Sequence, residues 1–190
     1  MNPSLLATTA IVPALHLLGG AMATRGGARM LVAIAVQESR AQYRIQLGTQ
    51  GQWARGFWQF ERGNRTLKGG CWGVCNHAQL RPNLDRVLDR LGIVTTMDVD
   101  AGTALHDLVH ERIAWNDILA ASVARLLLWS LPRALPGVAD EGEGWAQYRA
   151  AWNPGKPRPD EWPKAWAIAR KVYPDGPAAD LEPVTQGVWA

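Results

Sequence analysis

The sequence has little cysteine, little net charge and no long apolar run, and each scarcity narrows what the protein can be. Its two cysteines, Cys71 and Cys75, are too few for a disulfide framework and do not fix the redox compartment. No stretch reaches the ~18 uninterrupted apolar residues that a membrane-spanning helix needs, so we expect no membrane span. The net charge of +3 is too small to indicate a nucleic-acid-binding protein. Because 47% of the 190 residues are apolar and 19% are charged, the composition excludes a disordered or fibrous chain.

Acidic residues are scarce in the first 70 positions. That segment holds eight Lys and Arg but only two acids, Glu38 and Glu61, whereas residues 71–190 hold 12 bases and 15 acids. A basic segment suggests an anionic polymer as partner. Its two isolated carboxylates, Glu38 and Glu61, are then candidates for a chemical role. Phe and Tyr are also scarce, at two and three, against ten Trp. Tryptophan-rich clefts stack on sugar rings, but indoles also fill cores, and composition leaves both uses open.

Helices joined by loops rich in Gly and Pro dominate the pattern. Apolar periodicity and capping residues predict helices over 3–18, 28–40, 82–91, 101–110, 118–131, 145–152 and 163–173. Asn116 or Asp117 is expected to cap the apolar helix at 118–131. The fold class is therefore mainly α, with at most a small β element around Phe57–Phe60. We expect one domain over residues 1–173 and a surface tail over 174–190.

Residues 5–23 look faintly like a signal peptide that ends in Ala21-Met22-Ala23. No Lys or Arg precedes Arg25, however, and Pro13 and His16 interrupt the apolar run. An amphipathic first helix is the favoured interpretation.

Glu38 is the most informative carboxylate. The apolar stripe of the helix expected at 28–40 consists of Leu31, Ile34 and Ala35, and Glu38 continues it with i, i+3, i+4, i+7 spacing. Glu38 also falls in the last turn, where the helix dipole disfavours an anion. Partial desolvation and the dipole both raise the pKa of a carboxyl group, as a general acid near neutral pH requires. The alternative is a helix-end Glu that pairs with Arg40 or Arg44.

Three segments carry a wider pattern. They are AIAVQESR at 33–40, ARGFWQFE at 54–61, and the apolar helix at 116–131 followed by YRAAWNPG at 148–155. Their order and spacing resemble those of the lysozyme-like superfamily, in particular the lytic transglycosylases and their phage and prophage relatives. The resemblance implies a lysozyme-like α-helical domain that cleaves the β-1,4 bond between N-acetylmuramic acid and N-acetylglucosamine in peptidoglycan.

The resemblance also implies roles for individual residues. Glu38 matches the family's catalytic acid/base, and Ser39 matches a serine that contacts the catalytic site and the substrate. Gln59 matches the glutamine of a turn that faces the cleft, where its amide can bind a sugar acetamido group. Trp152 and Asn153 match the family's Tyr-Asn pair. We therefore expect Glu38 in the main cleft, near Gln59 and the turn at 148–155.

Departures from the family pattern are concentrated in aromatic residues. Trp152 replaces a tyrosine and lacks its hydroxyl, for which the nearby Tyr148 is a substitute. Phe57 and Trp58 replace smaller or more flexible residues, which predicts a more aromatic cleft. Trp58 and Trp152 are expected to stack on sugar rings. Arg44 and Arg55 are the expected cations at the rim.

The reaction depends on whether a second carboxylate takes part. Glu61 is a possible second carboxylate, as in a hydrolytic muramidase, although an exposed Glu beside Arg62 is the simpler interpretation. The lytic transglycosylase resemblance implies that one Glu acts first as acid and then as base, while the muramic 6-hydroxyl attacks and leaves a 1,6-anhydro end. We favour this single-Glu reaction, which needs no cofactor.

A metal site has weaker support. His106 and His110 have the i, i+4 spacing of zinc ligands on a helix, and Cys71 and Cys75 could supply two thiolates. Asp107 stands where a zinc protease would need Glu, so that chemistry is not supported. We assign no metal and keep a structural zinc shared by the four side chains as an alternative.

Two functions remain open. The first is a peptidoglycan-cleaving enzyme encoded by a phage, which reaches the periplasmic cell wall from the host cytoplasm through a lesion, or as part of the virion. The second is a virion or tail protein that keeps a lysozyme-like fold with little or no activity. The altered Trp-Asn-Pro-Gly turn and the aromatic residues beside Gln59 motivate the second.

Overall fold

The computed structural model describes residues 1–46, 54–66, 68–93 and 103–184. In chain order its elements are α1 (Pro3–Leu6), the π-helical η1 (Ala7–Ile11), α2 (Val12–Leu18), the 3-10 turn η2 (Gly20–Met22), α3 (Arg25–Ser39), α4 (Gly70–Asn76), α5 (Arg81–Arg90), α7 (Leu105–Arg112), α8 (Asp117–Trp129), α9 (Glu141–Trp152), the 3-10 turn η3 (Pro159–Glu161) and α10 (Trp162–Val172). The mainly helical fold class is confirmed. The described ranges contain isolated β-bridges, Ile45 with Arg55 and Arg55 with Phe60, but no sheet.

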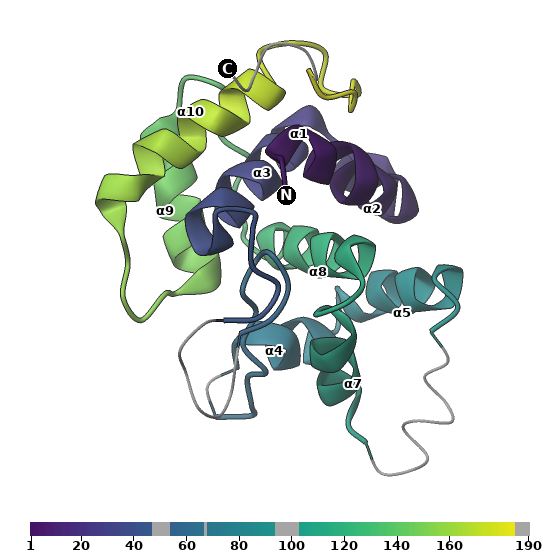
Figure 1. Cartoon of the computed structure of the whole chain (residues 1–190). Helices are drawn as coiled ribbons and strands as arrows, with labels where there is room; N and C mark the ends of the chain where they lie inside the picture. The colour runs from purple at the N-terminus through teal and green to yellow at the C-terminus, as the bar shows by residue number, and fades with distance from the viewer. Residues whose placement is uncertain (47–53, 67, 94–102, 185–190) are drawn as a thin grey trace.

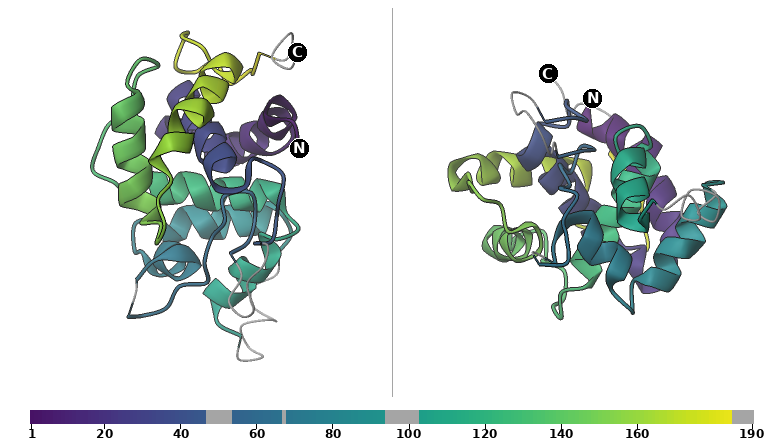
Figure 2. Two further views of the ribbon diagram at one scale, coloured as in Figure 1. Left: turned by 60° about the vertical axis from the view of Figure 1, so that its left-hand side comes forward. Right: turned by 90° about the horizontal axis from the view of Figure 1, so that it is seen from below.

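Helix α8 lies at the centre of the molecule. It packs against α2, α3, α4, α5 and α9, and Figures 1 and 2 show α1–α3 and α10 on one side of it and α4, α5 and α7 on the other. Its residues 119–126 are all buried. The Asn116 side chain accepts a 2.9 Å hydrogen bond from the Leu119 amide, which is the predicted N-cap. The helix ends at Trp129, two residues earlier than predicted, ahead of Pro132.

The first helical stretch runs from Pro3 to Leu18 as predicted, but it is not a uniform α-helix. Residues 7–11 form a π-helical segment, in which the Val12 amide donates to the Ala7 carbonyl. Pro13 follows immediately and has no N–H to donate. The stretch ends at Gly19, whose φ of 65° favours glycine.

Helix α3 carries Glu38 and is buried on almost every side. It begins at Arg25, three residues before the predicted start, because the Thr24 side chain caps it by accepting from the Gly27 amide. Gly26 and Gly27 therefore lie inside the helix. At Gly27 a Cβ atom would come within 2.9 Å of Nε of Arg125, so glycine here permits close helix packing. Figure 1 shows α10 lying across α3.

The segment over residues 46–79, expected from the sequence to be a loop, contains a helix. Helix α4 starts at Gly70 within a glycine-rich run, which gives a weak helix signal. The backbone at Gly63 passes close to the backbone at Gly69. A Cβ atom at Gly63 would lie only 1.9 Å from the Gly69 carbonyl oxygen, so this close approach requires glycine. Helix α9 begins at Glu141 rather than at the predicted Trp145, and a Cβ atom at Gly144 would come within 2.8 Å of the Trp166 ring.

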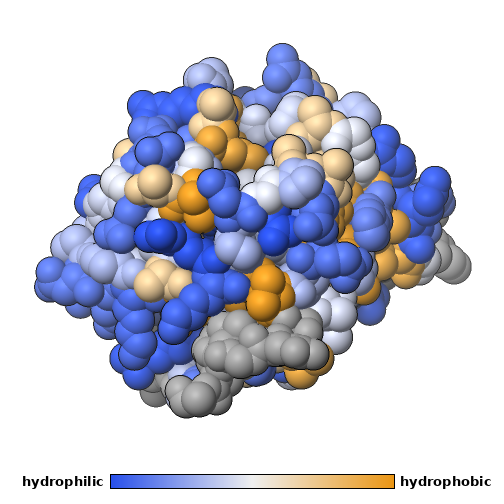
Figure 3. All heavy atoms as spheres, turned by 90° about the horizontal axis from the view of Figure 1, so that it is seen from above, coloured by the Kyte–Doolittle hydropathy of each residue, from blue (hydrophilic) through white to orange (hydrophobic). Residues whose placement is uncertain are grey.

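The chain after α10 folds back over the helices as far as residue 184. Arg25 donates to the Pro174 carbonyl and pairs with Asp180 at 2.8 Å, and the Val184 amide donates to the Val172 carbonyl. The face seen from above is mostly hydrophilic, with small separate apolar patches (Figure 3). No helix in the described ranges has the length and apolarity to span a membrane.

Candidate active site

Glu38 lies in the last turn of α3, and its carboxyl group is partly buried. The Tyr148 hydroxyl donates a 2.6 Å hydrogen bond to its Oε1 atom. Burial raises the pKa of Glu38 above its ordinary value, and the negative charge of Glu61 raises it further. The Tyr148 hydrogen bond and the positive charge of Arg158 oppose these effects without cancelling them. The carboxyl group therefore retains a proton to a higher pH than an exposed Glu does.

Tyr148 is held rigidly by an aromatic cluster between α9 and α10. Its ring stacks on Trp162 with centroids 5.3 Å apart and an interplanar angle of 13°, and it also contacts Trp145. Only 2% of the residue is exposed. Burial and the neighbouring Glu38 carboxylate raise the pKa of the phenol, so the hydroxyl stays protonated and acts as a donor.

Ser39 ties the end of α3 to the turn that contains Gln59. Its hydroxyl lies 2.8 Å from the Phe57 carbonyl oxygen and 3.1 Å from that of Ala35. Gln59 adopts a φ of 49°, and its side-chain amide donates to the backbone carbonyls of Gly56 and Tyr43 at 2.9 and 3.3 Å. The turn is thus fixed by hydrogen bonds on both sides, and the Gln59 donors are already used by the protein itself.

The two tryptophans expected to stack on sugars have different environments. Trp58 is fully buried, at 0% exposure, and its indole donates to the Leu31 carbonyl at 2.9 Å. The expectation that Trp58 contacts substrate is therefore wrong. Its ring packs in the hydrophobic core and has no accessible face on which a sugar could stack. Trp152 is partly buried. Its indole donates to the Trp58 carbonyl at 2.8 Å, and its ring lies 5.5 Å from that of Phe60.

A clamp between α3 and the segment after α9 was missed from the sequence. The Gln37 side chain donates to the Arg158 carbonyl at 2.9 Å, and the Arg158 guanidinium donates to the Gln37 carbonyl. Arg158 also pairs with Glu161 at 2.9 Å. Gln37 is 1% exposed although it is polar, and its position next to Glu38 was the only signal for it. Asn153, in contrast, is exposed and ends α9 with a φ of 43°.

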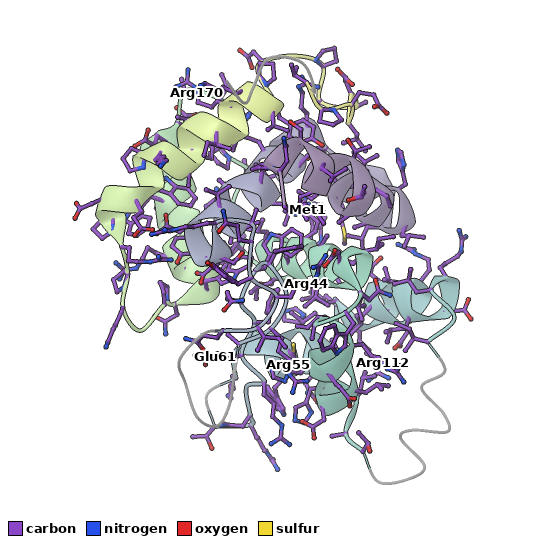
Figure 4. The ribbon with its side chains drawn as sticks, in the orientation of Figure 1. Met1, Arg44, Arg55, Glu61, Arg112 and Arg170 are labelled. Carbon is purple, nitrogen blue, oxygen red and sulfur yellow. The ribbon has the colours of Figure 1, made fainter. Side chains whose placement is uncertain are left out.

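The charged residues expected around the site are only partly placed as predicted. Glu61 is exposed at the edge of the loop region below α3 (Figure 4), and it forms no ion pair with another described residue. Its neighbour Arg62 pairs with Asp107 instead. Arg44 is not a free rim cation, because it forms a bidentate pair with Asp117 at 2.8 and 2.7 Å. No local sequence pattern predicts that long-range pair.

Glu38 does not line either of two well-formed pockets in the described part of the chain. The larger, about 420 Å³, lies between the chain near Arg55 and α7 and contains the exposed indole of Trp115. The smaller, about 290 Å³, lies between the start of α3 and the end of α8. Glu38 contacts Tyr148 of α9, and its neighbour Ser39 joins the turn that contains Gln59, but Glu38 lies outside these two pockets.

The proposed zinc ligands are not gathered into a site. No three His, Cys, Asp or Glu side chains come together within the described ranges. Cys71 and Cys75 are both buried and unbridged, and burial raises the pKa of the Cys75 thiol to about 12. His110 faces the Phe60 carbonyl at 3.1 Å.

Comparison of the chain with protein-family models, with curated proteins and with solved structures finds no match.

Proposed function

We propose that this protein is a peptidoglycan-cleaving glycosidase, a lytic transglycosylase or muramidase, with Glu38 as general acid/base. The observation that carries the proposal is the state of Glu38: a partly buried carboxyl group with a raised pKa, held by a buried tyrosine hydroxyl at 2.6 Å. A carboxyl group with a raised pKa that is held by a hydrogen bond is suited to act as the general acid in glycosidic bond cleavage. The resemblance of the three sequence segments supplies the substrate class.

In the proposed reaction Glu38 donates its proton to the oxygen of the glycosidic bond. The bond between that oxygen and the anomeric carbon breaks, and positive charge develops on the sugar ring. The ionised Glu38 then removes the proton of the nucleophile that attacks the anomeric carbon. In a lytic transglycosylase the nucleophile is the 6-hydroxyl of the same muramic residue, and in a muramidase it is water.

The Tyr148 hydroxyl and the Arg158 charge act on the ionised form of Glu38 in this cycle. Both lower its pKa, and so both stabilise the carboxylate that remains after proton transfer. The hydroxyl that the family carries on the tyrosine replaced by Trp152 is supplied here from one turn earlier in α9.

A second candidate is a virion or tail protein with a lysozyme-like fold and little or no activity. The observation that favours it is that Trp58 is fully buried and the Gln59 side-chain amide donates to the protein's own carbonyls, so two side chains expected to bind substrate are engaged within the fold. In either case we propose a phage-encoded protein that acts at the bacterial cell wall, in the virion or after release from the host cytoplasm.

Zymography on purified peptidoglycan separates the two candidates. Wild-type protein should clear the substrate, and Glu38→Gln, which keeps the shape of the side chain but cannot donate a carboxyl proton, should not. Asp85→Asn, on the exposed side of α5, is the matched control and should clear the substrate like the wild type. Absence of clearing by folded wild-type protein would favour the structural role, whereas equal clearing by Glu38→Gln would show an active protein in which Glu38 is not the acid/base.

A further inference from the structure

A second polar site lies at the opposite end of α3 from Glu38. We call it the Arg125 pocket. It has a volume of about 290 Å³, and its lining includes Thr24, Arg125, Trp129 and Arg133. These residues come from the turn before α3, the end of α8 and the segment that follows α8. Its charged lining consists of two arginines and no carboxylate.

Arg125 is a buried cation that pairs with no acidic side chain among the described residues. Only 1% of the residue is exposed, and its Nε atom donates to the Met22 carbonyl at 2.9 Å. Its two terminal nitrogens form no hydrogen bond with another described residue, and its guanidinium lies 5.1 Å from the centre of the Trp129 ring. Desolvation lowers the pKa of Arg125 to about 10, and no acidic neighbour opposes this effect. Buried charges in proteins are normally paired, and the Arg125 guanidinium has no acidic partner among the described residues.

The helix beside Arg125 adds to the positive potential of the pocket. The Thr24 hydroxyl lines the pocket and caps α3, whose first turn presents the positive end of the helix dipole. The Arg125 guanidinium packs against this first turn, where the missing side chain of Gly27 makes room for it. A cation at this end of a helix is unfavourable, whereas an anion is stabilised. The arrangement is therefore suited to a bound anion.

Arg133 supplies the second cation. It extends from the segment after α8 and is about half exposed, and its only ion pair in the described chain is a long one, 3.6 Å, with Glu143. A guanidinium fork binds a tetrahedral oxyanion through two parallel hydrogen bonds, and two such groups suit a doubly charged ligand. Apart from Thr24, the rest of the lining is apolar, which suits a ligand with an uncharged body.

We propose that the Arg125 pocket binds a phosphate or sulfate group, held by Arg125 and Arg133 beside the first turn of α3. This inference does not depend on the proposed glycosidase function, because it uses no residue near Glu38.

Thermal unfolding with increasing inorganic phosphate tests the proposal. Phosphate should raise the melting temperature of the wild type along a saturating curve, by about 3–6 °C at ~10-fold above the dissociation constant. Arg125→Met keeps most of the buried stem but removes the charge, and should show only the small, non-saturating rise that any excluded salt produces. Arg133→Gln should need more phosphate for the same effect. Arg81→Met, on exposed α5, is the matched control and should behave like the wild type.

Isothermal titration with phosphate, sulfate and acetate gives an independent readout. Phosphate or sulfate should bind the wild type at one site, more tightly than acetate. The same saturating shift in Arg125→Met as in the wild type would overturn the proposal, as would tighter binding of acetate or no binding of either tetrahedral anion. If Arg125→Met does not fold, the test depends on Arg133→Gln, and an affinity equal to that of the wild type would overturn it.

Discussion

The Tyr148 hydroxyl donates a 2.6 Å hydrogen bond to Oε1 of Glu38 from a position 110 residues further along the chain. This bond joins α9 to the end of α3. The hydrogen bond orients the Glu38 carboxyl group. Burial makes ionisation of this carboxyl group unfavourable. In the proposed reaction, the pair would set both the direction in which Glu38 delivers a proton and the pH at which it does so.

Tyr148→Phe should lower kcat on peptidoglycan by roughly 10-fold to 100-fold, because a hydrogen bond to a charged group contributes about 1.5–3 kcal/mol. Since that bond lowers the pKa of Glu38, its loss should also move the alkaline limb of the pH–rate profile to higher pH. Rates measured between pH 4 and 9 would show both effects. Tyr173→Phe is the matched control, because Tyr173 is also buried but its hydroxyl bonds to none of the described residues. An unshifted profile for Tyr148→Phe would reduce Tyr148 to a packing residue.

Glu38→Gln should be more stable than the wild type at neutral pH. The pKa of Glu38 is raised in the folded protein, so ionisation costs folding free energy. That cost is absent below the ordinary pKa of 4.5, develops as the pH rises through the raised value, and is fully present above it. The melting temperature of Glu38→Gln should therefore exceed that of the wild type by a few degrees at pH 7–8, and the difference should shrink toward pH 4. A difference that grows on acidification would contradict the raised pKa.

Arg158 should act as a positioning residue for Glu38. Arg158→Met removes both the charge and the contact with the Gln37 carbonyl, whereas Arg158→Lys keeps the charge. Because that charge lowers the pKa of Glu38, only Arg158→Met should move the alkaline limb of the pH–rate profile upward. Both variants should raise KM if the clamp positions the segment after α9. Equal profiles for the two variants would exclude an electrostatic role.

The sequence predicted the helical architecture because caps and apolar periodicity are local signals. Asn116 caps α8 as expected, and Glu38 lies in the last turn of a buried helix as expected. The start of α9 and the whole of α4 were not predicted, because glycine has a low helix propensity. The glycines in these helices are tolerated because of tertiary packing, as where Gly144 lies against the Trp166 ring.

Long-range polar contacts could not be predicted from local patterns. The Arg44–Asp117 pair, the Gln37–Arg158 clamp and the unpaired Arg125 each depend on how distant elements meet. The burial of individual tryptophans could not be predicted from local patterns either. Trp58 and Trp152 pack in adjoining parts of one cluster, but the structure shows that Trp58 is fully buried and Trp152 is partly exposed.

Digestion products should identify the nucleophile. If Glu38 alone carries the reaction, peptidoglycan fragments should end in 1,6-anhydromuramic acid, which mass spectrometry distinguishes because hydrolysis adds a water. Glu61→Gln should then keep most of the activity, since Glu61 is exposed and influences Glu38 only weakly. Reducing ends in the wild-type digest, together with an inactive Glu61→Gln, would instead indicate a two-carboxylate muramidase.

Trp152 should contribute to both stability and substrate positioning, and two substitutions separate these roles. Trp152→Ala removes a ring packed on Phe60 and Tyr148, and should lower the free energy of unfolding by about 3 kcal/mol. Trp152→Phe keeps most of that packing but leaves the Trp58 carbonyl without its 2.8 Å donor, which should cost about 1–2 kcal/mol.

Activity normalised to folded protein then decides whether Trp152 contacts the substrate. If its exposed edge positions a sugar, Trp152→Ala should raise KM and lower kcat, because a misplacement of ~1 Å can reduce the rate by about 100-fold. Trp152→Phe should retain intermediate activity, since a smaller flat ring still stacks on a sugar face. Unchanged kcat and KM in the folded fraction of both variants would make Trp152 a core residue only, and would leave Glu38 and Tyr148 as the working part of the site.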